Sequence, residues 1–196
     1  MRYPPSHKHA TRRRIVAAAS AAFRESGVEG TGVDEVMRRA GLTHGGFYAH
    51  FHDKSELVAE ACVDAFDEAI INLDRISSQP TAAKRVRLLI DSYLSPRHRD
   101  NRGSGCLIVA VGADMGRLTG PARAGYSRGF VRHIDRLCEA LRLARDPEEN
   151  RDRVTHLMSS LVGALIFARA TEDPARSDAL LKSSRRMLRK TFSNFP

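Results

Sequence analysis

One stretch of the chain constrains its fold more than any other: apolar residues recur at helical spacing, without a break, from Leu57 to Leu73. A helix with a continuous apolar stripe is stable in water only when other elements cover the stripe. Because no segment shows the alternation of a strand bounded by turns, other helices must supply that cover. The sequence therefore predicts an all-α fold.

Start and stop signals predict the remaining helices. The long helix opens at the sequence DKSE, where Asp53 caps and Glu56 reaches back. An earlier helix ends at Gly27, and Thr31 is expected to cap a short helix that closes at Gly41. Further helices are expected within residues 86–94, from about 106 to 118, within 126–143 and 154–170, and after 174, with 95–105 as the clearest loop.

Composition excludes several classes of protein. The chain has 196 residues, enough for one domain or two small ones, and is 42% hydrophobic and 28% charged, as in ordinary globular proteins. No apolar run approaches the roughly 20 residues of a membrane span, and no secretory leader is visible after the basic N-terminus. Three cysteines without CxxC spacing indicate neither a disulfide framework nor a zinc site. We therefore expect a cytoplasmic protein.

The charge favours a polyanionic partner. The formal net charge is +9, and residues 1–14 contribute five of these positive charges with no acid among them. Such an excess favours nucleic acid first and anionic membrane second. We expect residues 1–9 to form a flexible basic arm, which could lie along phosphates or in a minor groove but could equally be a solvated tail.

The stretch AGLTHGGFYAHFHDK, residues 40–54, places two adjacent glycines in a short helix, where each costs roughly 0.5–1 kcal/mol relative to alanine. Two short helices separated only by a turn at Gly41 are typical of a helix-turn-helix. Thr43 would then cap the recognition helix, and Gly45 and Gly46 would let its backbone approach DNA closely. The glycines thus indicate a close partner on this face.

The aromatic residues of the same stretch divide into two sets. Phe47 and Phe51 are four residues apart and are expected to face the core. Tyr48 and His50 are expected to project outward and donate to phosphate oxygens, with Lys54 adding a charge on the same side.

The stretch TGVDEVMRRAGLTHGGFYAHFHDKSEL resembles the DNA-binding region of the TetR family of bacterial repressors, whose pattern is T-x-x-x-x-I-A-x-x-A-G-V-S-x-G-x-x-Y-x-H-F-x-x-K-x-x-L. The close match covers about residues 10–60. Met37 stands where a small residue is usual, and Gly32 where Ser or Thr is commoner, which removes one phosphate contact. By position, the resemblance implies a DNA-facing set of Thr31, Thr43, His44, Gly45, Gly46, Tyr48, His50 and Lys54.

The resemblance also implies a domain organisation. Residues 10–55 would form the helix-turn-helix domain, and 56–196 a helical effector-binding and dimerisation domain. The last two long helices would pair with a second subunit, so that two heads read a two-fold symmetric operator. Seven residues are expected at or beneath that interface, with ordinary intramolecular core as the alternative: Leu157, Met158, Leu161, Leu165, Leu180, Leu181 and Leu188.

Cys106 is the candidate sensor. It follows a glycine-containing loop and opens a helix, and the helix dipole with Arg97, Arg99 and Arg102 would favour a thiolate. The stretch LSPRHRDNRGSGC is similar to one in a subset of TetR-like regulators, some of which look like sensors of electrophiles or oxidants; many have Pro after the cysteine, where this chain has Leu107. A conventional ligand pocket and a packing role for Cys106 stay open, whereas Cys62 and Cys138 lie on apolar faces and are expected to be inert.

The pattern as a whole predicts a homodimeric transcriptional repressor, released from a palindromic operator by a small molecule or a thiol-reactive effector, that needs no cofactor. The alternative is a sequence-indifferent, nucleoid-type DNA-binding protein. An enzyme is not expected, because no catalytic constellation is visible; the HRD triplet of residues 98–100 lacks the other kinase motifs. A metal site at His44, His50 and His52 is disfavoured because their spacing does not share one helix face.

Overall fold

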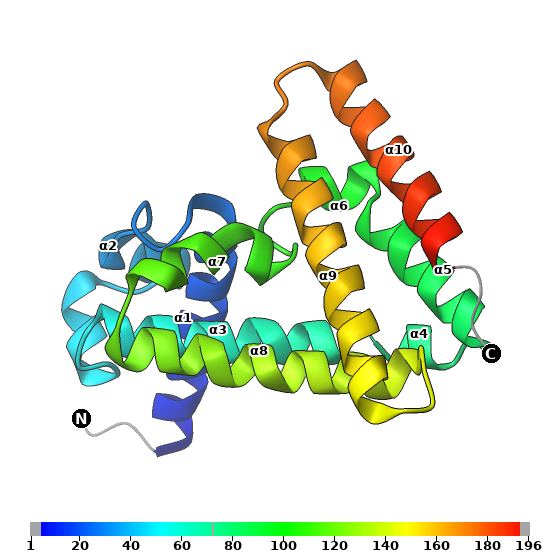
Figure 1. Cartoon of the computed structure of the whole chain (residues 1–196). Coiled ribbons are helices and arrows are strands. Elements are labelled where there is room, and N and C mark those ends of the chain that lie inside the picture. Colours follow the sequence, from blue (N-terminus) through cyan, green and yellow to red (C-terminus); the bar gives the residue numbers. More distant parts are fainter. Residues whose placement is uncertain (1–4, 72, 193–196) are drawn as a thin grey trace. The chain divides into compact units, whose positions relative to one another are not determined.

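In the computed structural model, which describes residues 5–71 and 73–192, every regular element is a helix (Figure 1). The prediction of an all-α fold is confirmed. The chain forms two compact units, one from the residues up to Asp67 with Arg102–Phe130, the other from Glu68–Asn101 with Val131–Pro196. No helix of the described residues is long and apolar enough to cross a membrane.

The first unit contains the expected helix-turn-helix and more. Its elements are α1 (Pro5–Ser26), α2 (Val33–Arg39), the 3-10 helix η1 (His44–Ala49), the greater part of α3 (Lys54–Ile71), α7 (Leu107–Arg117) and the first half of α8 (Gly120–Leu141). Buried residues of α7 belong to the same hydrophobic core as those of the N-terminal helices, among them Phe23, Phe47 and Val111. The N-terminal helices therefore share their core with residues far along the chain, whereas the sequence division placed a boundary at residue 55.

Two glycines end the first two helices as the sequence predicts. Gly27 follows α1 with φ +73° and Gly41 follows α2 with φ +66°, a conformation that residues with a Cβ rarely adopt. At the end of α2, the guanidinium of Arg14 also donates to the Ala40 carbonyl oxygen at 2.6 and 2.9 Å. The turn between α2 and η1 is thus tied to α1.

The N-terminal arm differs from the expectation. Helix α1 begins at Pro5, so residues 5–9 are helical; residues 1–4 of the expected arm lie outside the described residues. Proline fits the start of a helix because the first N–H groups of a helix have no acceptor within the helix, so the missing N–H of proline costs no hydrogen bond there. Lys8 consequently has a defined place on α1, one turn before Arg12.

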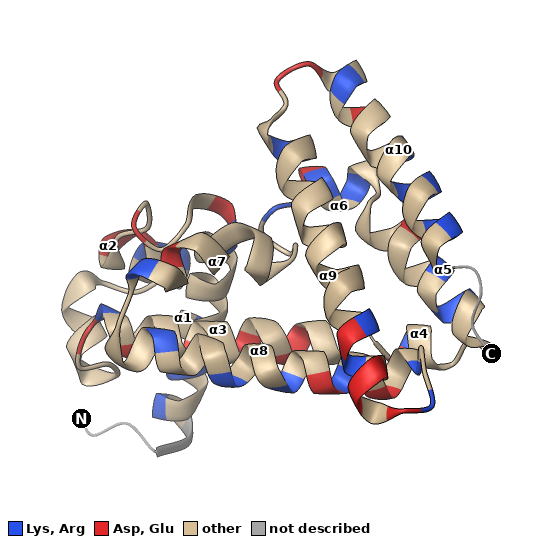
Figure 2. Ribbon diagram, in the orientation of Figure 1, with Lys and Arg blue, Asp and Glu red and all other residues tan. Residues whose placement is uncertain are grey.

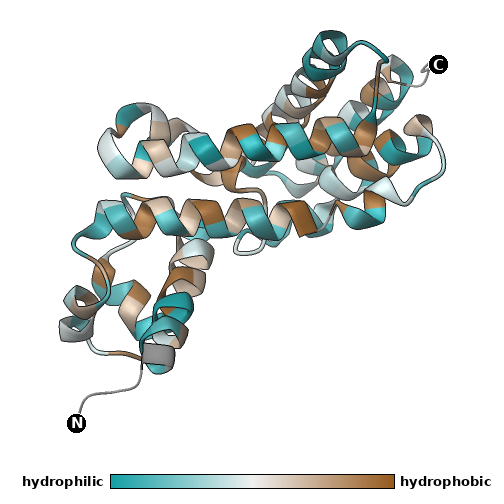
Figure 3. Ribbon diagram, turned by 90° about the horizontal axis from the view of Figure 1, so that it is seen from below, coloured by the Kyte–Doolittle hydropathy of each residue, from teal (hydrophilic) through white to brown (hydrophobic). Residues whose placement is uncertain are grey.

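The second unit consists of the remaining helices. They are α4 (Asp74–Ser77), α5 (Ala82–Tyr93), α6 (Pro96–Asp100), α9 (Pro147–Ala170) and α10 (Pro174–Thr191), with the ends of α3 and α8. Four of these helices have a side-chain oxygen at the N-cap that accepts a backbone N–H bond, and three also have Pro in the first turn. The capping residues are Thr81, Ser95, Asp146 and Asp173. Teal and brown alternate along most helices in Figure 3, as expected for helices that bury one face.

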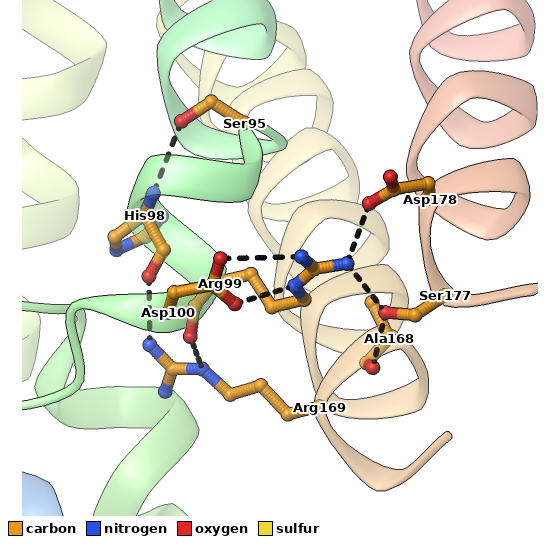
Figure 4. A network of polar contacts seen from close by, with 8 residues as sticks. All are labelled: Ser95, His98, Arg99, Asp100, Ala168, Arg169, Ser177 and Asp178. Atoms are coloured by element: carbon orange, nitrogen blue, oxygen red, sulfur yellow. Dashed lines mark hydrogen bonds and ion pairs between the residues drawn. The ribbon is translucent and has the colours of Figure 1, made fainter. Parts of the chain in front are cut away.

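The expected loop of residues 95–105 contains helix α6, so this prediction was wrong for residues 96–100. The HRD triplet anchors α6 on α9 and α10 (Figure 4). Arg99 donates to Asp178 at 2.7 Å and to Ser177 at 2.8 Å, and Arg169 donates to the carbonyl oxygens of His98 and Arg99. A polar sequence looked like a loop because these partners lie about 70 residues further along the chain.

Most of the residues expected at a dimer interface are buried within the chain itself. Leu157, Leu161 and Leu165 of α9 and Leu181 of α10 are fully buried, and Met158 and Leu188 nearly so. Only Leu180 is exposed among the seven. The exposed large apolar side chains of these two helices are Ile166, Phe167, Leu180 and Met187. Helix α10 also bears a series of basic residues (Figure 2).

Candidate nucleic-acid interface

The segment after Gly41 forms a 3-10 helix rather than an α-helix. Thr43 has extended backbone angles (φ −84°, ψ 153°) and occupies the N-cap position as predicted, but its side chain makes no capping bond. The Gly46 N–H donates instead to the Thr43 carbonyl oxygen at 3.1 Å. Six residues with two glycines have little intrinsic helix propensity, so packing must hold η1 in place. The exposed Thr43 hydroxyl is thereby left available to a ligand.

The packing comes from the aromatic residues. Phe47 and Phe51 are 1% and 2% exposed and stack with ring centroids 5.5 Å apart, which confirms that they face the core. Tyr48 is 68% exposed and meets Phe47 edge-on at 5.3 Å. Arg12 of α1 lies over the Phe51 ring, 4.0 Å from its centroid, and donates to Glu56 and Glu60 of α3. Phe51, two residues beyond η1, is thus in contact with α1, while Tyr48 of η1 faces outward.

The two glycines differ in their surroundings. A Cβ added at Gly45 would meet no atom within 4 Å, whereas one at Gly46 would lie 3.5 Å from Cε of Met37. Met37 is fully buried, so the glycine at 46 faces the large residue that departs from the family pattern. Neither glycine has a positive φ. The protein interior therefore does not require glycine at 45, which is consistent with room kept for a partner outside the chain.

Thr31 does not belong to this surface. It is 1% exposed, and its hydroxyl donates to the Gly27 carbonyl oxygen at 2.7 Å. The N-cap of α2 is Gly32, without a side-chain cap, so the prediction that Thr31 caps this helix was wrong. The turn between α1 and α2 draws Thr31 inward, where it cannot reach a phosphate.

Lys54 is bound within the unit. Its Nζ donates to the Val28 carbonyl oxygen at 2.7 Å, and the Val28 N–H donates to Asp114 of α7 at 3.3 Å. Burial lowers the pKa of Lys54, which nearby Glu29 partly opposes. This bond uses one of the three N–H donors of the Lys54 ammonium group.

His50 lies at the end of η1 beside α1. Its Nδ1 is buried and has no hydrogen-bond partner among residues 5–71 and 73–192. Burial lowers the pKa of His50, and the positive charges of Lys8, Arg12 and His7 act in the same direction. Lys8 is exposed, and no carboxylate among the described residues lies within ion-pair distance of it. The sequence predicts only that Lys8 belongs to an arm that could lie along phosphates. The structure places it on helix α1, four residues before Arg12.

His44 is the first residue of η1, and its side chain is about half exposed. Its Nδ1 is bonded to the carboxylate of Asp34 of α2, and its ring meets Tyr48 edge-on at 6.1 Å. Nδ1 of His52 instead lies 3.5 Å from Oδ2 of Asp53. The described residues contain no group of three side chains able to hold a metal ion. The exposed members of the candidate interface are thus Thr43, His44, Gly45 and Tyr48, with His50 and Lys8 beside them.

Cys106 lies elsewhere in the same unit. It is the N-cap of α7 and is half-buried, and its side chain makes no capping bond. Arg99, one of the three arginines expected to favour its thiolate, is bound to Asp178 and Asp100. Burial raises the pKa of Tyr126, and the nearby thiols of Cys106 and Cys62 raise it further. Burial raises the pKa of Cys62 itself to about 12, as expected of an inert core cysteine.

Two family models match the chain, one after the other. Residues 15–61 match the family model of bacterial regulatory proteins of the tetR family, and residues 82–184 match the tetracyclin repressor-like C-terminal domain. The HTH-type transcriptional regulator TtgR of Pseudomonas putida is 40% identical over 67 residues, 34% of this chain and 31% of TtgR. The transcriptional regulator AcuR of Cereibacter sphaeroides is 27% identical over 113 residues, 56% of this chain and 51% of AcuR. The matches thus span 31% of TtgR and 51% of AcuR.

Solved structures extend the likeness of fold over nearly the whole chain. Reduced NemR of E. coli has a TM-score of 0.75 at 21% identity and covers 93% of this chain and 96% of its own. AibR, in complex with isovaleryl coenzyme A and operator DNA, has a TM-score of 0.62 at 21% identity, with 94% and 100% covered. The two family models together match most of the sequence, one over the helix-turn-helix and one over the helical body. The chain belongs to the TetR family of bacterial regulatory proteins.

Proposed function

We propose that this protein is a transcriptional repressor that binds a specific DNA sequence through η1 and is released by an effector. The observation that carries the proposal is the first turn of η1. There, Thr43, His44 and Gly45 are exposed, while Phe47 and Phe51 hold the helix from beneath. A rigid short helix with an uncovered polar turn fits the major groove, and Gly45 leaves space for the duplex.

The contacts divide by the information they carry. His44 and the backbone at Gly45 would meet base edges, because they open η1. Tyr48, His50 and Thr43 would donate to phosphates, which position the protein without reading sequence. A Cβ at Gly46 would make only ordinary van der Waals contact with Met37, and Lys54 would contribute the N–H donors that its bond to Val28 does not use.

We propose a homodimer that reads a two-fold symmetric operator. The support is a group of exposed apolar side chains on α9 and α10, among which Phe167 is 65% and Met187 53% exposed. Large apolar groups clustered on two packed helices are typical of a surface that a second subunit covers. The paired chains would place two copies of η1 on half-sites one helical turn apart.

The effector would act through α7. Helix α7 begins at Cys106, packs its apolar face into the core that α1 shares, and holds the Val28 N–H through Asp114. A displacement of α7 would therefore move the turn between α1 and α2, which Lys54 also holds. AibR was solved with a coenzyme A thioester and DNA, so a small-molecule effector is one candidate, and covalent modification of Cys106 is the other.

Two experiments test these proposals. Selection of bound duplexes from a random pool should yield a palindrome at physiological salt; equal retention of all sequences with a steep salt dependence would instead indicate a sequence-indifferent DNA-binding protein. The selected duplex then serves to test the sensor, with the protein and its Cys106→Ser variant each treated with N-ethylmaleimide. Release of the wild type alone supports Cys106 as the sensor. Equal responses of the two proteins would assign the effect to another residue.

A further inference from the structure

The imidazole of His44 is held in one orientation by two other side chains. Its Nδ1 is bonded to the Asp34 carboxylate, which comes from α2, and Tyr48 lies against the ring edge-on at 6.1 Å. Asp34 is largely exposed and makes no bond to the N-terminus of α2. The only hydrogen bond that the described structure gives this carboxylate is the one to the first residue of η1.

This bond decides which ring nitrogen of His44 carries the proton. An ionised carboxylate only accepts hydrogen bonds, so the proton of the pair must lie on Nδ1. In the neutral imidazole Nε2 is then unprotonated and acts as an acceptor. Nε2 lies on a different edge of the ring from the bonded Nδ1, and about half of the side chain is exposed. His44 thus presents an acceptor to an incoming ligand.

We propose that Asp34 determines the base preference of this protein, by fixing Nε2 of His44 as an acceptor for the exocyclic amino group of adenine or cytosine. In the major groove, only these two bases carry such a donor, whereas guanine and thymine present acceptors. Asp34 touches no base and is a positioning residue. The inference rests on the proposed function, because it requires η1 to enter the major groove.

Removal of Asp34 should separate selectivity from affinity. Without the carboxylate, the proton can lie on either nitrogen, and the Nε2–H form donates to guanine or thymine. Asp34 also places a negative charge beside the phosphates, so its loss should strengthen binding to every duplex. An ordinary DNA contact would show the opposite, with weaker binding after truncation. Higher affinity together with lower selectivity is therefore the signature of a positioning carboxylate.

The experiment is selection from a random duplex pool with the full-length protein and three variants, at pH 8.5 to disfavour an imidazolium, in which both nitrogens donate. His44→Ala identifies the base position that His44 reads, as the position that loses its preference. Asp34→Ala and Asp34→Asn test the carboxylate, and Glu148→Ala, which removes an exposed acid from the start of α9, controls for the change in net charge. Circular dichroism confirms that the variants fold; little loss is expected, because Asp34 is exposed.

We expect adenine or cytosine at the position read by His44 in the wild type. In Asp34→Ala the preference for adenine or cytosine over guanine and thymine should fall about fivefold, which is the low end for a base contact. Asp34→Ala should also bind every duplex more tightly than the Glu148→Ala control does. The base preference of Asp34→Asn should lie between those of the wild type and Asp34→Ala, since an amide can either accept a hydrogen bond from Nδ1 or donate one to it. Guanine or thymine selected by the wild type, or an unchanged preference in Asp34→Ala, overturns the inference. If the selected palindrome is the same for His44→Ala as for the wild type, the inference is also overturned, but the proposed function stands. If the wild type selects no sequence at all, the proposed function itself is refuted.

Discussion

Helices α3 and α8 approach each other closely at Gly125, and this contact supports a quantitative prediction. A Cβ added at Gly125 would lie 2.7 Å from Cα of Ala59 and 2.8 Å from its Cβ and carbonyl oxygen. These are mostly backbone atoms of a packed helix, so they cannot move aside as the end of a flexible side chain can. Gly125→Ala must therefore push α8 away from α3 within the first unit.

The magnitude follows from two opposing effects. Overpacking of a well-packed core costs about 1–3 kcal/mol, and alanine for glycine inside a helix contributes about 1 kcal/mol in the other direction. The clash should win, because it involves three backbone or Cβ atoms at once. We expect a net loss of up to about 2 kcal/mol in the free energy of unfolding. At roughly 2–4 °C per kcal/mol for a chain of this length, Tm should fall by several degrees.

The assay is thermal and urea denaturation at fixed protein concentration, because association would make Tm depend on concentration. Gly116→Ala is the matched control: it lies in α7 of the same unit, and a Cβ there would meet no atom within 4 Å. This control should be neutral or slightly stabilised. If Gly125→Ala were stabilised to the same degree as Gly116→Ala, the close approach of α3 and α8 would be refuted.

Three further predictions concern pH, salt and association. Burial lowers the pKa of His133 from its ordinary value of 6.5 to about 4, so the unfolded chain binds the proton more tightly. The stability associated with neutral His133 is complete above pH 6.5, and about 3 kcal/mol of it is lost as pH falls to 4. His133→Gln should flatten the pH dependence of urea unfolding, and an unchanged curve would contradict the burial. Lys8→Ala should reduce the slope of log K against log salt concentration by about one phosphate contact on all sequences, as measured by fluorescence anisotropy. Lys84→Ala, which removes a lysine of the other unit, should leave this slope unchanged. If the wild type and both variants have the same slope, Lys8 does not contact DNA. Phe167→Asp should shift the protein toward a monomer in light scattering, whereas an intact dimer would place the subunit contact elsewhere.

Much of the local structure could be predicted from the sequence because its causes are local. The glycines that end α1 and α2, the Asp53 cap of α3 and the inward packing of Phe47 and Phe51 depend on residues at most four positions apart. The same holds for the exposure of Tyr48, which follows from the spacing of η1. Capping, helical spacing and turn chemistry act over this range, so a single sequence displays them.

Two of the failures have a common cause, which is a partner distant in the sequence. Lys54 is held by Val28, 26 residues earlier. Helix α6 looked like a loop because Arg99 finds Asp178, 79 residues later. Each of these side chains is polar and flexible, and its sequence neighbours do not indicate where its partner lies.

The sequence by itself determined the helical fold, the position of the helix-turn-helix and the family, because periodic apolar residues, caps and aromatic spacing recur along the chain. Only the tertiary structure decided which polar groups of that region are available to a ligand. It removed Thr31 from the candidate interface, bound Lys54 to Val28, brought Lys8 to His50 and joined Asp34 to His44. The physical reason is that a polar side chain bonds to whichever group folding brings within about 3 Å, and no local pattern encodes that encounter.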